Sequence, residues 1–266
     1  RCIIENNADK RMREYMTLKE LLQGIAYVSI EGPSDITVES IHYDSRQVTS
    51  QSLFFCIRGL KYDGHDFAPQ AVENGAHVLV LEEDVPLSGI TKVFVNDSRK
   101  TMALVAKAFY GDPTRNINLI GVTGTNGKTT ITHLIKSILE QQGRKVGLIG
   151  TITNMIGDEK IPSEFTTPEA PDLYRLFRQM AREAVDSIVM EVSSHSLALE
   201  RVAGCLFDVG IFTNLSQDHL DFHQSMEEYR AAKAKLFRQS RISVINVDDK
   251  NGRMLLDGVS GAVRTY

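Results

Sequence analysis

The sequence contains few cysteines, no long apolar run and no large excess of either charge. Its cysteines are Cys2, Cys56 and Cys205, and no two of them have the CxxC spacing. This usage argues against a disulfide framework and a structural zinc site, and it favours a cytoplasmic protein. No apolar stretch approaches the roughly 20 residues that a membrane span needs, and no signal-peptide layout is present. We therefore expect no membrane partner.

The formal net charge of −4 gives no broad positive field, so we expect no nucleic-acid partner and a local site for any anionic ligand. The 266 residues, with 42% hydrophobic and 24% charged side chains, are typical of a globular chain with one large domain or two ordinary ones. The segment Gly111-Asp112-Pro113-Thr114 interrupts the pattern strongly. We therefore predict two domains, residues 1–114 and residues 115–266.

Strand-like and helix-like segments alternate in both predicted domains. In the first, we expect a helix after Thr17, strand-like residues over 36–58, 77–81 and 92–95, and helices over 67–74 and 101–109. In the second, we expect strands at 117–122, 146–149, 187–192, 209–213 and 242–246, with helices starting at Lys128, near 172 and near 226. This alternation predicts a small N-terminal α/β domain, followed by a parallel sheet that is covered on both faces. The helix from Lys128 has one predicted apolar face, made of Ile131, Leu134, Ile135, Ile138 and Leu139.

A glycine-rich turn over residues 124–129 follows a predicted strand and precedes a predicted helix. Its glycines permit close approach to a ligand, and the helix N-terminus attracts anions. Lys128 is placed to reach phosphates, and the Thr129 hydroxyl is placed to bind Mg²⁺. The general pattern G-x-x-x-x-G-K-S/T requires glycine where Val122 stands, and Gly121 comes one position early. The alternative is a glycine-rich turn with a fortuitous Lys-Thr pair.

The helix predicted near residue 226 carries a lysine on its apolar face. Ser225 and Glu228 form a capping box at its start. Lys233 has helical spacing to the apolar residues Tyr229 and Leu236, so it points inward. The residues alone leave two interpretations open. Either the ammonium extends to water along the surface, or a buried amine with a lowered pKa acts as a nucleophile.

Polar side chains follow other predicted strands. Glu191 lies near the C-terminal end of the strand at 187–192, where ligands of parallel sheets bind, and a buried carboxylate there requires a cation such as Mg²⁺. The alternative is that its carboxylate reaches solvent. His219 lies in the loop after the next strand, and Asn246 and Asp248 follow the last one. Ordinary capping and turn formation are the alternatives for these three residues.

These motifs together resemble the Mur ligases over roughly residues 36–250. Residues 123–130 look like the shortened phosphate loop of that family, and residues 214–221 look like its Asn-Leu-x-x-Asp-His-Leu-Asp signature. The resemblance implies an enzyme that phosphorylates a carboxylate with ATP before an amine attacks the acyl phosphate. It also implies ATP contacts from Gly124, Thr125, Asn126, Gly127, Lys128, Thr129, Thr130, Asn246 and Asp248.

In this family, the lysine of an Ala-Ala-Lys segment like residues 231–233 is carbamylated by CO₂ and helps to hold a second Mg²⁺ ion. The resemblance therefore implies two Mg²⁺ ions and a lysine carbamate. The implied catalytic residues are Lys128, Glu191, His219 and Lys233. The implied metal ligands are Thr129, Glu191, His219 and carbamylated Lys233.

Other segments resemble the tripeptide-forming branch of the family, which adds a diamino acid to UDP-N-acetylmuramoyl-L-alanyl-D-glutamate. Residues 166–169 and 190–197 carry this likeness in the second domain, and residues 43–46 and 53–65 resemble the uridine-binding half. Leu199 stands where the family often has glutamine, and a hairpin stabilised by an Asp–Arg pair is an alternative for the two segments of the first domain. The implied substrate contacts are Tyr43, Ser45, Leu60, Lys61, Tyr62, Thr166, Thr167, Ser193 and Arg201.

Family members carry a third, C-terminal domain that closes over ATP and selects the diamino acid. The sequence begins with Arg1 and ends at Tyr266 without it, so we expect a monomeric fragment that lacks ligase turnover. Diaminopimelate and lysine both remain open as the added residue. Two competing interpretations are another ligase of the superfamily, which adds D-Ala-D-Ala or extends a folate with glutamate, and a non-catalytic nucleotide-binding module. The segment 193–195 argues against the first, and the intact site residues argue against the second.

Overall fold

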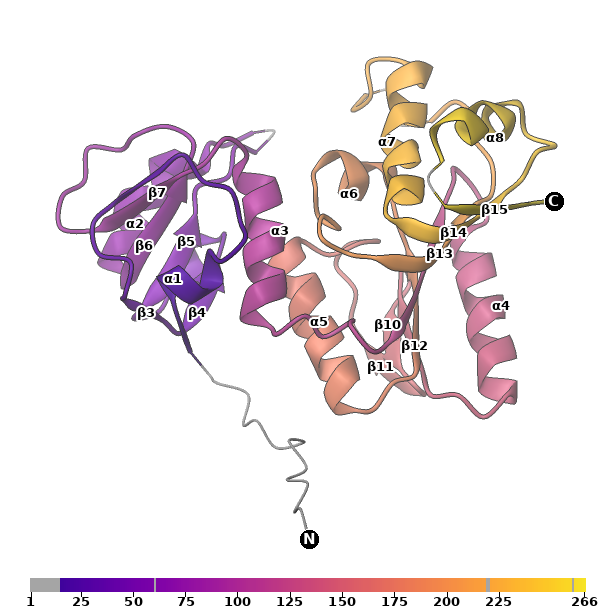
Figure 1. Cartoon of the computed structure of the whole chain (residues 1–266), viewed down its shortest axis with the longest axis horizontal. Helices are drawn as coiled ribbons and strands as arrows, with labels where there is room; N and C mark the ends of the chain where they lie inside the picture. Colours follow the sequence, from indigo (N-terminus) through magenta and orange to yellow (C-terminus); the bar gives the residue numbers. More distant parts are fainter. Residues whose placement is uncertain (1–14, 60, 219–220, 260) are drawn as a thin grey trace, which may run out of the picture. The chain divides into compact units, whose positions relative to one another are not determined.

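The chain forms two compact units, Arg1–Thr101 and Met102–Tyr266. Each is described separately below. The structure is a computed structural model (Figure 1). It describes residues 15–59, 61–218, 221–259 and 261–266.

Helix α3 (Ser98–Phe109) contains the division between the two units. After the division, Ala103 packs with alanines of the second unit. The Lys107 Nζ also donates a hydrogen bond to Gly204 O at 2.9 Å. The later residues of α3 therefore belong to the second unit, and the division comes earlier than the break that we expected after Thr114.

The first unit is built on a five-stranded sheet. Its elements in chain order, before α3, are β1 (Met16–Thr17), α1 (Leu18–Leu21), β2 (Ser29–Glu31), β3 (Thr37–Val38), β4 (Ser40–His42), β5 (Ser52–Phe55), α2 (Ala68–Glu73), β6 (Ala76–Leu81) and β7 (Thr91–Phe94). The sheet has the order β2-β7-β6-β5-β4, in which β2 is antiparallel to β7 and the other neighbours are parallel. Strands β1 and β3 form a separate antiparallel pair.

Local sequence signals explain two helix boundaries in this unit. Thr17 caps α1, because its hydroxyl accepts a hydrogen bond from the Glu20 amide at 3.2 Å while the Glu20 carboxylate accepts one from the Thr17 amide at 2.9 Å. Gly75 follows α2 with φ of +112°, a conformation that favours glycine. All four residues of β5 are buried, as expected for a strand covered on both faces.

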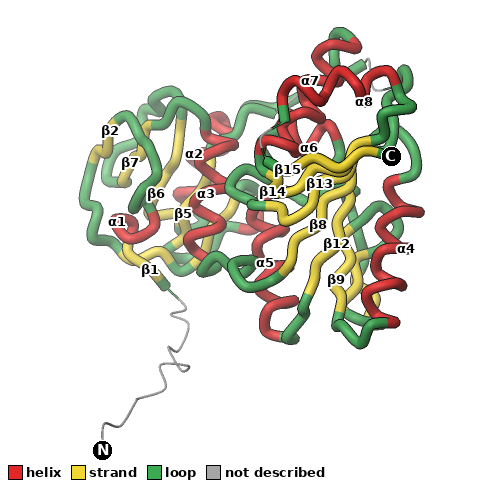
Figure 2. The backbone as a smooth tube through the Cα atoms, turned by 45° about the vertical axis from the view of Figure 1, so that its right-hand side comes forward, coloured by secondary structure: helices red, strands yellow, loops and turns green. Residues whose placement is uncertain are grey.

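The second unit contains an eight-stranded, mostly parallel sheet. Its elements after α3 are β8 (Asn118–Thr123), α4 (Lys128–Gln141), β9 (Val146–Ile149), β10 (Asn154–Ile156), β11 (Glu159–Ile161), α5 (Ala170–Arg182), β12 (Ser187–Glu191), α6 (Ser194–Ala198), β13 (Phe207–Phe212), α7 (Met226–Arg238), β14 (Ser240–Ile245), α8 (Lys250–Leu255) and β15 (Ala262–Thr265). The order is β11-β10-β9-β12-β8-β13-β14-β15, in which β10 is antiparallel to both β11 and β9 and the other neighbours are parallel. Figure 2 shows α4 and α5 on opposite faces of β8, β9 and β12. The predicted α/β fold with a parallel sheet is confirmed.

Helix α4 uses a narrower apolar face than the sequence predicts. Ile135 and Leu139 pack against buried residues of β9 and β12. Leu134 and Ile138 each leave 57% of their surface exposed, whereas Lys136 is buried. The predicted apolar stripe is wider than the contact that a helix makes with a sheet, so one edge of it remains outside. Leu134 and Ile138 therefore lie in the predicted helix but outside its contact with the sheet.

Short elements account for what the sequence did not predict. The β10–β11 hairpin, α6, α8 and β15 each have only three to six residues per element, which is too short for a hydrophobic period to stand out. The described α-helices have 4 to 14 residues. Within the part of the chain that the structure describes, none is both long and apolar enough to cross a bilayer.

Candidate active site

Strands β8, β9 and β12 end at one edge of the large sheet, and the loops that follow them line a cavity. Ligands bind at this edge in open α/β sheets. The cavity has a volume of about 530 Å³ and combines residues predicted for ATP with residues predicted for the acyl substrate. Its lining consists of Thr125, Asn126, Gly127, Lys128, Thr129, Thr151, Phe165, Thr166, Thr167, Glu191, Ser193, His195 and Arg201.

The loop between β8 and α4 has the backbone that its glycines predict. Gly124 and Gly127 have φ values of +151° and +84°. A Cβ atom at Gly124 would collide with the Thr213 hydroxyl, so this position requires glycine. Gly127 is the N-cap of α4, and the first amides of a helix have no helical partner. These amides and the helix dipole make the loop suitable for binding phosphate.

Asn214 follows strand β13, which pairs with β8, and it holds this loop in place. Its backbone carbonyl accepts a hydrogen bond from the Thr125 amide at 2.9 Å. Its side chain accepts one from the Asn126 amide at 3.0 Å and donates one to the Asn126 carbonyl at 3.1 Å. No role was predicted for Asn214, although it directly follows a predicted strand. The loop is therefore positioned before any ligand arrives.

Lys128 folds back over its own loop. Its Nζ donates hydrogen bonds to Gly124 O and Thr125 O, both at 2.9 Å. Burial lowers the pKa of this lysine, while the negative charges of Glu191 and Asp218 act against that shift. An ammonium that donates its hydrogen bonds to neutral carbonyls gains strongly from a phosphate anion.

Glu191 ends β12 inside the protein, with only 1% of its surface exposed. Its carboxylate accepts hydrogen bonds from the Thr129 hydroxyl, at 3.0 Å to each oxygen. It also accepts bonds from the Thr151 amide at 3.0 Å and from the Thr151 hydroxyl at 3.2 Å. The alternative in which this carboxylate reaches solvent is wrong. Thr151 was not predicted, although it follows the end of β9 just as Glu191 ends β12.

Lys233 lies inside the protein on α7, with 1% of its surface exposed. Its Nζ donates a hydrogen bond to Gly124 O at 3.0 Å and lies 4.6 Å from the centroid of the Tyr229 ring. Burial, reinforced by the positive charge of Lys128, lowers the pKa of Lys233 to about 7. The ammonium therefore does not extend to water. This shift favours the neutral amine, which is the nucleophilic form of a lysine.

The residues predicted for the acyl substrate meet on the wall of the same cavity. Arg201 Nη2 pairs with Glu169 Oε1 at 2.7 Å, and Arg201 Nη1 donates to Thr167 O at 3.0 Å. The Thr167 hydroxyl donates to Glu191 O at 2.8 Å and accepts a hydrogen bond from the Ser193 amide at 3.2 Å. These residues and the end of β12 therefore form one hydrogen-bonded group.

The cavity wall also holds Ser193, which was predicted to contact the acyl substrate, and two residues to which the sequence gave little or no role. Ser193 caps α6, because its hydroxyl accepts a hydrogen bond from the Ser196 amide at 3.1 Å. His195, in the first turn of α6, and Phe165 also line the cavity. The Phe165 ring centroid lies 5.3 Å from the guanidinium carbon of Arg201, a cation–π contact. A single histidine or phenylalanine carries no sequence signal for such a position.

Several predicted ATP residues are not part of the cavity lining. Thr130 and Asp248 are exposed, and Asn246 Nδ2 donates a hydrogen bond to Thr213 O at 2.8 Å instead. Their predicted contacts with ATP stay predictions. His219 lies outside the described residues, so its place at the site also stays a prediction.

The oxygen donors at the phosphate-loop end of the cavity suit Mg²⁺. The Glu191 carboxylate and the Thr129 hydroxyl are hard oxygen ligands 3.0 Å apart. Mg²⁺ commonly takes one or two protein ligands and completes its shell with water and substrate phosphates. Across the described ranges, no group of three or more His, Cys, Asp or Glu side chains is placed to hold a metal ion. The second predicted metal site depends on His219 and stays a prediction.

In the first unit, the structure describes four of the predicted nucleotide-sugar residues, namely Tyr43, Ser45, Lys61 and Tyr62. Leu60 lies outside the described residues. The Ser45 side chain is buried, and its hydroxyl donates to Gln70 Oε1 at 2.7 Å. Arg46 pairs with Asp44 at 2.7 Å, but β4 and β5 run parallel, so no hairpin joins these two strands. Within residues 53–65, however, Arg58 and Asp63 form an antiparallel bridge and an ion pair at 3.2 Å, as the alternative of a hairpin with an Asp–Arg pair expects. The sugar-binding roles of these residues stay predictions.

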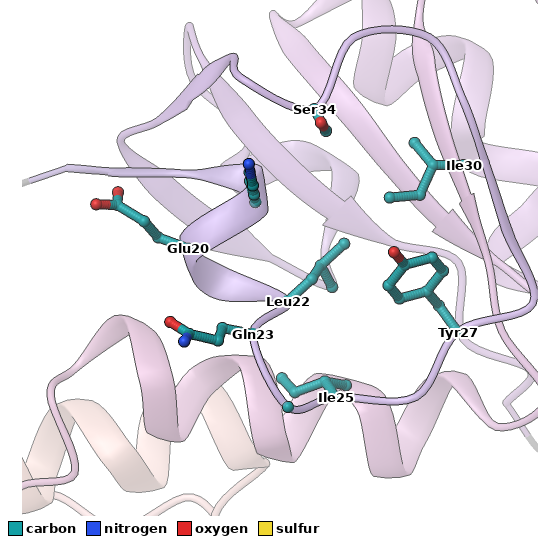
Figure 3. A pocket seen from close by; sticks show the side chains of 9 residues that line it. Glu20, Leu22, Gln23, Ile25, Tyr27, Ile30 and Ser34 are labelled. Carbon is teal, nitrogen blue, oxygen red and sulfur yellow. The ribbon is translucent and has the colours of Figure 1, made fainter.

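A second cavity, of about 590 Å³, lies beside α1 in the first unit (Figure 3). The side chains of Leu22, Ile25, Tyr27 and Ile30 surround it. The described nucleotide-sugar residues are not among those that line it. This cavity therefore gives no support to the predicted uridine site.

Comparisons with known proteins show the family of the chain. Residues 122–266 match the family model described as Mur ligase middle domain, and residues 37–110 match the one described as Mur ligase family, catalytic domain. The chain belongs to the Mur ligase family. This Mur ligase chain is 51% identical over 253 residues to the UDP-N-acetylmuramoyl-L-alanyl-D-glutamate--2,6-diaminopimelate ligase of Caldanaerobacter subterraneus subsp. tengcongensis. The aligned region covers 94% of this chain and 52% of that relative. The protein of the same name from Alkaliphilus metalliredigens is 51% identical over 246 residues, or 92% of the chain and 50% of that relative.

Solved structures agree with this assignment. A structure of a UDP-N-acetylmuramoyl-L-alanyl-D-glutamate--2,6-diaminopimelate ligase superposes with a TM-score of 0.83 at 27% identity, over 94% of this chain and 52% of that chain. A MurF from Acinetobacter baumannii superposes with a TM-score of 0.63 at 19% identity, over 94% of this chain and 53% of that chain, which shows a shared fold. The Mur ligase chain spans about half the length of the curated relatives it matches.

Proposed function

We propose that this Mur ligase chain carries the ATP-binding and acyl-substrate-binding parts of a ligase that joins 2,6-diaminopimelate to UDP-N-acetylmuramoyl-L-alanyl-D-glutamate. The γ-phosphoryl group of ATP is transferred to the side-chain carboxylate of the D-glutamyl residue, and ADP leaves. An amine of diaminopimelate then displaces phosphate and forms the amide bond. The names of relatives at about half identity support this reaction, and they favour diaminopimelate over lysine.

The observation that carries the proposal is the shared cavity of the second unit. One wall is the phosphate loop, with Lys128 and Thr129, and another holds Thr166 and Arg201. Glu191 lies between them, bonded to Thr129 and, through its backbone carbonyl, to Thr167. A carboxylate that is bound in this cavity lies within reach of a phosphate at the N-terminus of α4. Such positioning is the main requirement of phosphoryl transfer.

Each group has a role that its surroundings support. Lys128 leaves the carbonyls of its own loop to neutralise the transferred phosphoryl group. Thr129 and Glu191 would hold a Mg²⁺ ion, which supplies positive charge to the phosphates. Arg201 carries N–H donors for the anionic groups of the acyl substrate. The site thus combines positive charge with fixed donors where negative charge accumulates.

Lys233 acts in this proposal as a carbamate. Its unprotonated Nζ attacks the carbon of CO₂, a C–N bond forms, and one proton leaves the nitrogen for solvent. The new carboxylate would form at Lys233 Nζ, near the positive charge of Lys128, and with His219 it would complete a second Mg²⁺ site. The burial of Lys233 and its pKa of about 7 support the first step, because only the neutral amine reacts.

The ligation itself tests the proposal. A polypeptide that contains this sequence and has the length of the relatives is incubated with ATP, Mg²⁺, UDP-N-acetylmuramoyl-L-alanyl-D-glutamate and either diaminopimelate or lysine. We expect phosphate release that requires both substrates, and a tripeptide product in the mass spectrum, formed faster with diaminopimelate. Lys128→Ala should abolish the product. The matched control is Lys145→Ala, which removes an exposed lysine paired with Glu183 and should leave the product unchanged.

Two other outcomes have a clear meaning. Phosphate release without ligated product would contradict the ligase and favour a nucleotide-hydrolysing or nucleotide-binding module. A product formed with D-Ala-D-Ala, or with glutamate on a folate, would assign the chain to another branch of the superfamily.

A further inference from the structure

Hydroxyl and carboxylate groups on the cavity wall form a continuous series of hydrogen bonds. Thr129 Oγ1 lies 3.0 Å from both oxygens of Glu191. Thr151 Oγ1 lies 3.2 Å from Glu191 Oε2, and the Thr166 and Thr151 hydroxyl oxygens are 3.0 Å apart. All four residues line the cavity. The series therefore runs from the phosphate loop to the residues predicted for the acyl substrate.

The number of protons sets the direction of these hydrogen bonds. A threonine hydroxyl has a single proton, and an ionised carboxylate only accepts. Thr151 donates its proton to Glu191, so its oxygen must accept in the bond with Thr166. Thr166 is then the donor in that bond. No proton of the Thr166 hydroxyl remains for a ligand, and only oxygen lone pairs are available to the cavity.

We propose that Thr166 accepts a hydrogen bond from a peptide N–H of the acyl substrate, and that Thr151 is the positioning residue that fixes this polarity. The inference rests on the proposed function, since the L-alanyl-D-glutamyl part of that substrate supplies the peptide N–H groups. Hydroxyl groups are often assigned to phosphate or carboxylate recognition, but an oxygen without a free proton repels an anion. The anionic groups of the substrate therefore go to Arg201, which only donates.

The same proton count applies at the other end of the series. Thr129 donates its proton to Glu191, so the lone pairs of its oxygen remain for a cation. One carboxylate thus prepares Thr129 to bind a metal ion and, through Thr151, prepares Thr166 to bind an N–H group. The second effect depends on the Thr151 hydroxyl alone, because the Thr151 amide donates separately to Glu191 Oε1 at 3.0 Å.

Substrate analogues test this polarity directly. Calorimetry measures the binding of UDP-N-acetylmuramoyl-L-alanyl-D-glutamate to the 266-residue chain. The measurement is repeated with two analogues, each of which replaces one of the two peptide N–H groups by an ester oxygen. An ester oxygen cannot donate and places a second set of lone pairs against Thr166. We expect the wild-type chain to bind one of the two analogues about tenfold more weakly than the parent compound.

Variants separate polarity from structural support. Thr151→Val keeps the shape and the backbone amide but frees the Thr166 proton, so the preference for amide over ester should fall below about threefold. Thr151→Ser should retain the preference. Thr166→Val, which lacks the acceptor, should also lose it. The matched control is Thr153→Val, because the Thr153 hydroxyl donates to the carbonyls of Asn154 and Ile161, which are not part of the series. This variant should keep the full preference for the amide over the ester.

The outcomes distinguish this inference from the proposed function. Equal binding of all three compounds by the wild-type chain would overturn the inference and leave the proposed function standing. A full preference in folded Thr151→Val would overturn the role of Thr151. If circular dichroism shows that Thr151→Val does not fold, Thr166→Val decides in its place. Absence of any binding of the parent compound would instead contradict the proposed function.

Discussion

Replacing Lys233 by methionine should stabilise the fold at neutral pH, by an amount that shrinks as the pH rises. Lys233 is almost fully buried, and its pKa is lowered from 10.5 to about 7. Between these values the unfolded chain binds a proton that the folded chain does not. The stability of the wild-type chain therefore rises with pH across this window, and below pH 7 the full cost of burying the charge is present. Methionine has a similar length and no such cost.

The size of the effect follows from the shift. A pKa difference of about 3.5 at about 1.4 kcal/mol for each unit gives a cost on the order of 5 kcal/mol at pH 7, and about 2 kcal/mol at pH 9. Methionine loses the hydrogen bond to Gly124 O and the contact with the Tyr229 ring, together about 2 kcal/mol. We therefore expect a net gain of about 3 kcal/mol at pH 7 that nearly disappears by pH 9.

Urea unfolding followed by circular dichroism measures this, because the sequence contains no tryptophan. The buffer is free of CO₂, since a carbamate would change the wild-type reference. The control is Lys235→Met on the same helix, because the Lys235 side chain is about a third exposed and donates a hydrogen bond to Leu197 O. This variant should change the free energy of unfolding by less than about 1 kcal/mol at either pH. A Lys233→Met variant that is no more stable than the wild type at pH 7, or whose advantage persists at pH 9, would refute the reasoning.

Three further substitutions test the site. Gly124→Ala forces a Cβ onto the Thr213 hydroxyl at φ of +151°. Calorimetry should therefore show loss of MgATP binding, and urea unfolding should show that the free energy of unfolding falls by about 1–3 kcal/mol. The control is Gly143→Ala, whose Cβ meets no atom and which should keep MgATP binding. Asn214→Ala removes both side-chain bonds to Asn126 and should weaken MgATP binding about tenfold without unfolding; unchanged affinity would show that the loop does not need this support. Glu191→Gln should weaken ATP binding about tenfold in the presence of Mg²⁺ and not in its absence, and an equal loss in both conditions would remove Glu191 from the metal site.

The position of the site could be predicted because parallel strands end at a common edge. That rule placed Glu191 beside the 124–129 turn, and the helical spacing placed Lys233 on the inner face of its helix. Both side chains are almost fully buried in the structure. The same rule applies to Thr151 after β9, but a threonine after a strand is too common in sequences to be singled out.

Contacts between distant segments could not be predicted, because strand order is not encoded in local periodicity. Asn214 reaches the phosphate loop only because β13 pairs with β8. The Tyr229 ring lies beside Lys233, and its hydroxyl is 3.2 Å from Thr125 Oγ1, which likewise depends on how α7 packs. Such contacts are set by the whole sheet and its helices. Sequence periods describe one element at a time.

A crystal structure of the chain with a non-hydrolysable ATP analogue, Mg²⁺ and UDP-N-acetylmuramoyl-L-alanyl-D-glutamate tests the central claim most directly. The account predicts the γ-phosphate at the N-terminus of α4 in contact with Lys128 Nζ. It also predicts the glutamyl side-chain carboxylate in the same cavity, between Glu191 and Arg201. A nucleotide bound elsewhere, or a glutamyl carboxylate outside this cavity, would contradict the account.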